Sequence, residues 1–210
     1  KSISIVVAAY NAEKSLEIGV KNIVNLLKNL FDDYELLIFD DCSKDETGEI
    51  ADRLAKRNSK IRIFHNKKNM NMGYNLRTGI KHATKKYLMF IAGTNDLPIN
   101  TIKNVLRSVG DETVILSYIV NQKDRPTKRW IISYLVTITL NFLFGLRIRY
   151  YFGIGAFETK LVKNVKMTTN SYAALAEVLI RMINDGHSYK EIPVYVGERR
   201  CHSTSAFRIR

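Results

Sequence analysis

Polar side chains suited to binding nucleotides and phosphates recur after short apolar segments in residues 1–97. An aromatic ring can stack on a nucleobase, and a carboxylate can accept hydrogen bonds from base N–H groups. An arginine can neutralise phosphate, and side-chain oxygens suit a hard divalent cation. The candidates are Tyr10, Asn11 and Glu13; Asp40, Asp41, Ser43 and Asp45; Asn71, Gly73, Asn75 and Arg77; and Thr94, Asn95 and Asp96. They predict a site for a nucleotide-like ligand, with Asp96 as the metal-ligand candidate.

Each of these groups also has a purely structural explanation. The segment 40–43 (Asp-Asp-Cys-Ser) is equally typical of a turn that leads into a helix N-cap. Gly73 could simply supply a positive φ angle, and Arg77 on a helix could be a solvated charge. The histidines, His65, His82, His187 and His202, have no metal-binding spacing. Only the common position of the groups, each directly after an apolar segment, favours a ligand site.

The apolar segments alternate between the patterns of buried strands and amphipathic helices. Strand-like runs span 3–9, 34–39, 61–65, 87–92, 114–120 and 189–196, and helices are expected at 16–30, 128–144 and 173–184. Ser43 and Glu46 stand in a capping-box relation before a helix that carries Ile50 and Leu54. The segment from 71 to 73 leads into a further helix that ends near Ala83.

This alternation predicts an α/β fold, a Rossmann-like three-layer sandwich with a mostly parallel central sheet. Ligands bind beyond the carboxyl ends of the strands in such a sheet. The polar groups are therefore expected to meet at one edge of the sheet. The length of 210 residues suits a single domain spanning 1–210.

The formal net charge of +13 favours an anionic partner, such as nucleic acid, anionic lipid headgroups or a phosphorylated substrate. A basic surface kept for solubility is the alternative. Cys42 and Cys201 lie far apart and are expected to be free thiols, which favours a reducing, cytoplasmic location. No secretory signal pattern occurs at the start of the sequence.

Basic residues surround the longest apolar run, which spans Trp130 to Leu146. They are Lys123, Arg125, Lys128, Arg129, Arg147 and Arg149. The run is too short for a spanning helix, so we expect an amphipathic helix at about 128–145 in the headgroup region. Two alternatives stay open: a protein–protein contact, or a core-facing side formed by Ile131, Leu135, Ile138 and Phe142. The cations do not accompany exposed stacking aromatics, so no nucleic-acid partner is predicted. A dinucleotide-binding fold is excluded because 9–13 lacks the required glycines.

Several segments of the chain resemble the family 2 glycosyltransferases, which have the GT-A fold. These segments are SIVVAAYNAEKSL, YELLIFDDCSKDET, NMGYNLRTGI and KKYLMFIAGTNDLP. The later stretches RPTKRWIISYLVTITLNFLFGL and EIPVYVGERRCHSTS resemble the acceptor region and the Arg-rich closing segment of that family. The resemblance is to the dolichyl-phosphate mannose synthase-like and polyprenyl-phosphate sugar transferases within it. It implies a nucleotide-binding part at 1–97 and an acceptor-binding part at 98–210.

The resemblance also implies roles for particular residues. The nucleotide site would contain Tyr10, Asn11, Glu13, Asp40 and Asp41; the acceptor phosphate would meet Arg125, Arg129, Ser133, Arg199 and Arg200; and the catalytic set would be Asp96, Arg77 and Arg129. The implied reaction moves a sugar from a nucleoside-diphosphate sugar to a polyprenyl phosphate, with inversion. Mg²⁺ or Mn²⁺ would assist, and the protein would lie peripherally on the membrane surface.

One departure from the family pattern bears on the metal. The family's Asp-x-Asp motif would align with Ile91-Ala92-Gly93, whose side chains cannot bind a hard cation. Asp96 and Asn95 are the nearest carboxylate and amide ligands, so we expect a metal site rebuilt around Asp96. The alternatives are metal-independent activity, or a catalytically weak or inactive relative that binds a nucleotide or a protein partner.

Overall fold

The computed structural model describes residues 1–93, 97–122, 126–195 and 197. In the first part of the chain, strands alternate with helices, as the sequence predicts. The elements are β1 (Ser2–Ala9), α1 (Leu16–Leu30), β2 (Asp33–Asp40), α2 (Thr47–Arg57), β3 (Ile61–His65), α3 (Asn71–His82) and β4 (Tyr87–Ala92). They are followed by α4 (Ile99–Arg107), β5 (Val114–Ile119), α5 (Thr127–Phe144), β6 (Gly155–Glu158), α6 (Thr159–Val162), α7 (Ala174–Asn184) and β7 (Tyr189–Val194).

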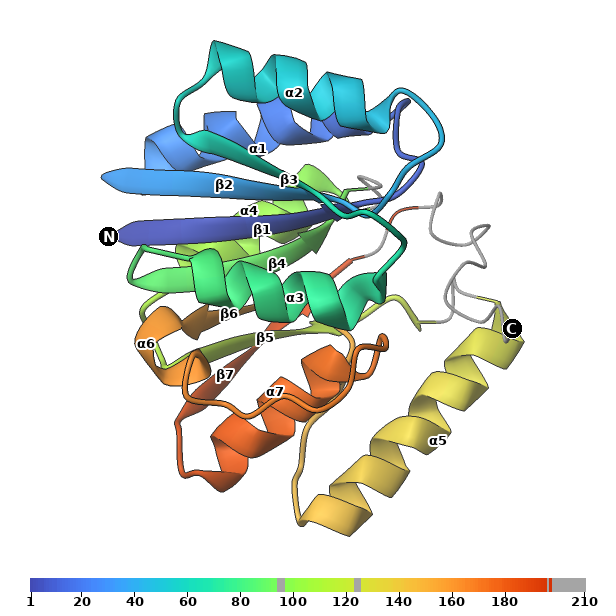
Figure 1. Ribbon diagram of the computed structural model, residues 1–210. Coiled ribbons are helices and arrows are strands. Elements are labelled where there is room, and N and C mark those ends of the chain that lie inside the picture. Colours follow the sequence, from blue (N-terminus) through green and yellow to red (C-terminus); the bar gives the residue numbers. More distant parts are fainter. Residues whose placement is uncertain (94–96, 123–125, 196, 198–210) are drawn as a thin grey trace.

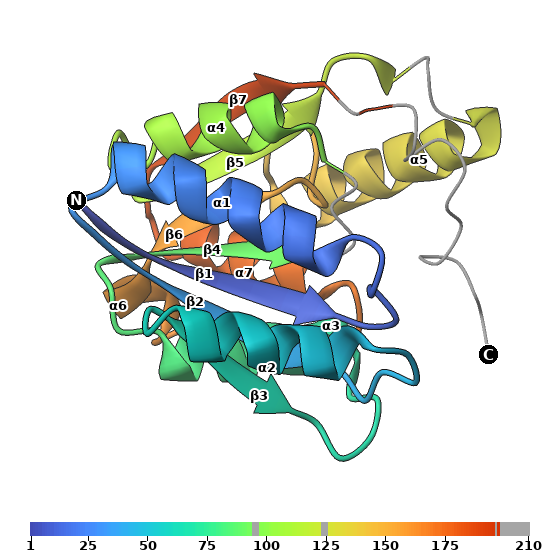
Figure 2. The same cartoon turned by 90° about the horizontal axis from the view of Figure 1, so that it is seen from above.

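A 7-stranded sheet in the order β3-β2-β1-β4-β6-β5-β7 forms the centre of the molecule. Helices α1, α2 and α4 cover one face of it, and α3, α6 and α7 cover the other (Figures 1 and 2). Successive residues of β1 enter the two cores in turn, with Ile5 and Val7 on one side and Val6 on the other. Because β1 is buried on both faces, its sequence is apolar rather than alternating. The predicted three-layer α/β fold is confirmed.

Strand β6 was not predicted. Among the described strands of the sheet, it is the one that runs antiparallel to its neighbours. It pairs with β4 and β5, both in the antiparallel sense. At four residues it is short, and it has no β-branched residue to mark it as a strand. The chain must pass very close to β5 here, because a Cβ at Gly153 would lie 2.0 Å from the carbonyl oxygen of Ser117. Glycine is required there by space rather than by φ.

One local prediction and one structural alternative are wrong. The capping box is absent, because α2 begins at Thr47 without a side-chain bond from its N-cap residue. The hydroxyl of Ser43 instead accepts a hydrogen bond from the backbone N–H of Asn11, at 3.1 Å. Gly73 does not supply a positive φ angle; that conformation belongs to Asn71, whose φ is 68°. A Cβ at Gly73 would lie 2.6 Å from the carbonyl carbon of Asn170, so close approach explains the glycine.

Helix α5 leaves the body of the molecule (Figures 1 and 2). The core-facing alternative for this helix is wrong, since Ile131, Leu135, Ile138 and Phe142 are 45%, 57%, 48% and 86% exposed. Its apolar side chains also project in several directions, so the helix lacks the clean amphipathic division that we expected. The exposed ones are Trp130, Ile131, Ile132, Tyr134, Leu135, Ile138, Phe142, Leu143 and Phe144. Among the described helices, none combines the length and apolar character that crossing a bilayer requires.

Candidate functional site

The loops after β1 and β2 are joined into one unit at the carboxyl edge of the sheet. Asn11 donates its N–H to the hydroxyl of Ser43, and its side-chain oxygen accepts the N–H of Lys44 at 2.9 Å. The N–H of Ala12 donates to the hydroxyl of Thr47 at 2.7 Å. Asn11 has a φ angle of 48°, a left-handed conformation that asparagine tolerates better than most residues. The two loops therefore form a fixed rim.

The carboxylates of Glu13 and Asp45 complete this rim. Glu13 donates its N–H to Asp45 at 3.3 Å and accepts the N–H of Glu46, also at 3.3 Å. Burial pushes the pKa of Asp45 upward, but hydrogen bonds from the hydroxyl and the N–H of Thr47 outweigh it and lower the pKa. Asn11 and Glu13, predicted to bind a nucleotide, thus use their side chains to build the rim.

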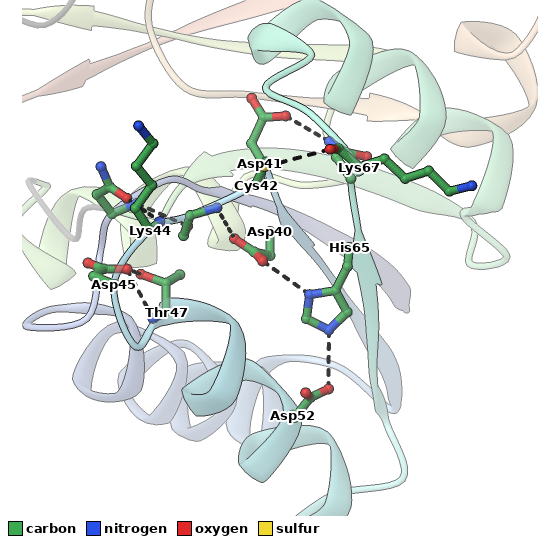
Figure 3. A network of polar contacts seen from close by, with 12 residues as sticks. Asp40, Asp41, Cys42, Lys44, Asp45, Thr47, Asp52, His65 and Lys67 are labelled. Atoms are coloured by element: carbon green, nitrogen blue, oxygen red, sulfur yellow. Dashed lines mark hydrogen bonds and ion pairs between the residues drawn. The ribbon is translucent and has the colours of Figure 1, made fainter.

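The buried carboxylate of Asp41 ties the end of β2 to the start of α3. It accepts hydrogen bonds from the side chain of Asn66 at 2.7 Å, from the N–H of Met70 at 2.8 Å and from the N–H of Asn71 at 3.0 Å. Asp41 therefore shapes the loop that precedes α3. The adjacent Asp40 turns away from this loop and toward His65 (Figure 3).

Tyr10 lies at the end of β1 with 44% of its surface exposed. Its ring is therefore accessible, and stacking on a nucleobase stays a prediction. Two exposed cations on neighbouring loops, Lys44 and Lys67, were not predicted (Figure 3). The pair Lys67-Lys68, in the loop between β3 and α3, was the signal that could have revealed the second of them.

The end of β4 packs tightly against the end of β1. Gly93 donates its N–H to the carbonyl of Ala8 at 2.7 Å, and the hydroxyl of Ser15 donates to the carbonyl of Gly93 at 3.3 Å. Beside this contact lies a cavity of about 60 Å³, lined mainly by apolar side chains that include Phe90 and Phe152. Its size and its lining suit neither a phosphate nor a whole sugar.

Arg77 projects from α3 toward the segment that precedes α7. Its guanidinium donates to the side-chain oxygen of Asn170 and lies 6.0 Å from the ring centroid of Tyr74. Gly73 donates its N–H to the carbonyl of Asn170 at 2.9 Å, which holds the same segment. Arg77 thus bridges two segments of the fold, and its contacts are with Asn170 and Tyr74 rather than with Tyr10 or Asp41.

The predicted acceptor residues are only partly described. Arg129 and Ser133 lie in the N-terminal half of α5. Both views place that end of α5 on the side where β1 and β4 end (Figures 1 and 2). The remaining candidates, Asp96, Arg125, Arg199 and Arg200, lie outside the described residues, as do Thr94 and Asn95.

The described residues do not form a site for a divalent cation. Within the described ranges, no group of three or more His, Cys, Asp or Glu side chains is placed to hold a metal ion. The described end of β4 offers Ile91, Ala92 and Gly93, which carry no side-chain oxygen.

Comparison with known proteins identifies relatives of this chain. The family model described as "Glycosyl transferase family 2" matches residues 4–176. The "Uncharacterized glycosyltransferase EpsJ" of Bacillus subtilis is 36% identical over 91 residues, which are 43% of this chain and 25% of the relative. The "Dolichyl-phosphate beta-glucosyltransferase ALG5A" of Trichomonas vaginalis is 27% identical over 137 residues, 60% of this chain and 42% of that relative.

A solved structure has the same fold. The glucosyl-3-phosphoglycerate synthase of Mycobacterium tuberculosis, in complex with Mn²⁺, UDP and phosphoglyceric acid, superposes with a TM-score of 0.67. It is 16% identical, and the match covers 93% of this chain and 69% of that one. At this identity the likeness concerns the fold, which is the GT-A fold. The chain spans only 25% and 42% of the lengths of the two curated relatives.

Proposed function

The chain belongs to glycosyl transferase family 2, and from this premise we propose that it moves a sugar from a nucleoside-diphosphate sugar to a polyprenyl phosphate at a membrane surface, with inversion. The observation that carries the proposal is the joined rim at the carboxyl edge of the sheet, where the loops bearing Tyr10, Asn11 and Asp41 meet. That edge is where parallel α/β sheets bind ligands.

Residues 1–97 bind the donor in this proposal. Tyr10 stacks on the base, because its ring is exposed at the end of β1. Asp41 accepts a base N–H through the lone-pair capacity that its contacts leave on Oδ2. Lys44, Lys67 and Arg77 supply positive charge for the diphosphate.

Residues 98–210 receive the acceptor in this proposal. The apolar side chains of α5 lie among the lipids, and Arg129 and Ser133 address the acceptor phosphate, together with Arg125, Arg199 and Arg200 beyond the described residues. The relative ALG5A is named for a dolichyl-phosphate acceptor, which supports this acceptor class. A lipid phosphate is already an anion at neutral pH, so the reaction needs no strong base.

We propose that Mg²⁺ or Mn²⁺ assists the transfer, so both ions are included in the assay. Similar solved structures hold Mn²⁺ or Mg²⁺ together with UDP. When bound, such an ion neutralises the charge that develops on the leaving diphosphate. Asp96 is the ligand candidate from the sequence.

A transfer assay tests the proposed function. The protein is incubated with UDP-glucose, UDP-galactose or GDP-mannose and a short polyprenyl phosphate, with Mg²⁺, Mn²⁺ or EDTA, and lipid-linked sugar is measured. We expect product with one donor, a fall of about tenfold or more in Tyr10→Ala and Arg129→Ala, and little change in the control Asp111→Asn, in the loop before β5 at the opposite edge of the sheet. Nucleotide binding without product under every condition would favour the non-enzymatic alternative.

A further inference from the structure

The imidazole of His65 lies between two carboxylates that come from different elements. His65 is the last residue of β3; its Nδ1 lies 3.1 Å from Oδ2 of Asp40 on β2, and its Nε2 lies 3.3 Å from Oδ1 of Asp52 on α2 (Figure 3). A neutral imidazole has only one N–H, whereas the imidazolium has two. The protonated ring alone can donate to both carboxylates at once.

Helix α2, which packs against this cluster, has a glycine at the point of closest approach. A Cβ at Gly48, in the first turn of α2, would lie 3.0 Å from Oδ2 of Asp40 and 3.4 Å from Cε1 of His65. A larger residue would therefore press on the hydrogen-bonded pair. The φ angle of Gly48 is not positive, so its role is to leave room for the ring and the carboxylate.

The carboxylate of Asp40 connects His65 to the rim of the candidate site. Its Oδ1 accepts the N–H of Ser43 at 3.1 Å. The hydroxyl of Ser43 in turn accepts the N–H of Asn11, also at 3.1 Å. A chain of hydrogen bonds therefore runs from His65 through Asp40 and Ser43 to Asn11, in the loop that carries Tyr10.

The charged groups that face the His65 ring are Asp40 from β2 and Asp52 from α2. Burial lowers the pKa of His65, but the hydrogen bonds and charges of Asp40 and Asp52 outweigh it and raise the pKa above its ordinary value of 6.5. Because the folded-state pKa is raised, any order that the charged ring provides is complete below pH 6.5 and is lost as the pH rises through the folded-state pKa.

We propose that His65 is a positioning residue that, as the imidazolium, fixes Asp40 and thereby the loops at 10–13 and 43–47. Asp40 then affects ligand binding by holding these loops in place, and it does not contact the ligand itself. The consequence for nucleotide affinity rests on the proposed function, whereas the consequence for loop order does not.

Hydrogen exchange tests the loop order without any nucleotide. At about pH 6, we expect the amides of Asn11 and Ser43 to exchange about tenfold faster in His65→Gln than in the wild type, as loss of a charge-assisted hydrogen bond implies. The difference should shrink as the pH is raised further and the wild-type ring loses its proton. His82→Gln is the matched control, because the His82 ring packs against Phe64 in a tilted orientation, with the ring centroids 4.7 Å apart, and Asp40 bonds to Ser43 and His65 instead. Equal exchange in His65→Gln and the wild type at the lower pH would overturn the proposal.

Asp52→Asn provides a milder variant, since it keeps the Asp40–His65 pair. It should lower the pKa of His65, followed by NMR titration of the ring, and raise loop exchange by less than His65→Gln does. An unchanged ring pKa would contradict the geometry.

Calorimetry with UDP and GDP tests the consequence for the ligand. The dissociation constant of the wild type should rise between about pH 6 and pH 8.5, and that of His65→Gln should stay nearly constant. A pH dependence that persists unchanged in His65→Gln would overturn the role of His65. Failure of both nucleotides to bind, with the exchange difference intact, would count against the proposed function alone.

Discussion

The buried carboxylate of Asp41 joins the end of β2 to the start of α3. One of its oxygens accepts from Asn66 and Met70, and the other accepts from Asn71. A carboxylate has about four acceptor positions, so one remains on the oxygen that faces Asn71. Asp41 can therefore shape its loop and still accept a hydrogen bond from a ligand.

Replacing Asp41 by asparagine should destabilise the protein by about 1–3 kcal/mol, because the new amide group would face backbone N–H donors. Urea unfolding at neutral pH measures this change. The control is Asp111→Asn, which loses an exposed ion pair with Lys190 at 2.9 Å and should cost less than about 1 kcal/mol. Equal losses in the two variants would mean that the Asp41 contacts contribute no more than a surface ion pair.

The sequence predicts which loops form the site, but not which atoms each side chain contacts there. Parallel strands end at one edge, so the convergence of Tyr10, Asn11 and Asp41 followed from the strand pattern. Adjacent residues such as Asp40 and Asp41 point to different sides of their strand end, and only three-dimensional contacts give each its partners. The same holds for Asn11 and Glu13, whose side chains bond to a loop more than thirty residues away.

Among the elements, those marked by a long apolar run were predicted well. Helix α5 was expected at 128–144 and spans Thr127–Phe144, and the last strand was expected at 189–196 and spans Tyr189–Val194. Strand β6 was missed because its four residues, Gly155–Glu158, have no pattern of their own. Its position depends on β4 and β5, which lie far from it in sequence and pair with it on both sides.

The C-terminal end of α5 is attached to the body by the side chain of Asn141. Asn141 donates to the carbonyl of Ile148 at 2.9 Å, accepts the N–H of Ile148 at 3.0 Å and accepts the hydroxyl of Tyr151 at 2.7 Å. Tyr151 is buried, and burial raises its pKa to about 12. Its hydroxyl is therefore neutral at physiological pH and acts as a donor.

Replacing Asn141 by alanine should cost about 1–3 kcal/mol of unfolding free energy, because Ile148 and Tyr151 lose their partners. Amide exchange in the segment 145–150 should also rise, since that segment connects α5 to β6. Thr139→Ala, at an exposed position of the same helix, should change stability by less than about 0.5 kcal/mol. If unfolding and exchange were the same in both variants, another contact would have to hold the helix.

Across the whole molecule, positive charge and an exposed apolar helix occur together. The net charge is +13, and the described basic residues include Lys128 within α5 and Arg147 and Arg149 shortly after it. Each basic residue near an anionic bilayer contributes up to about 1 kcal/mol. The apolar side chains of α5 can add hydrophobic burial to that attraction. The combination favours reversible attachment to an anionic lipid surface.

The single tryptophan of the chain, Trp130, reports directly on this attachment, since it lies on α5 and is 41% exposed. We expect its fluorescence to shift to shorter wavelength with vesicles containing anionic lipid, and less so with zwitterionic vesicles or at high salt. Replacing Leu135 and Phe142 together by serine should weaken vesicle binding by about tenfold or more, because each apolar side chain contributes up to about 2 kcal/mol when buried.

The matched control for that test is Ile18→Ser, which removes an apolar side chain that is 58% exposed on α1. General hydrophobic adsorption would depend on both helices, whereas docking through α5 depends on the apolar side chains of that helix and not on Ile18. The double variant should therefore lose binding while Ile18→Ser keeps it. Equal weakening in both proteins, or no shift of Trp130 at any lipid concentration, would rule out α5 as the membrane contact.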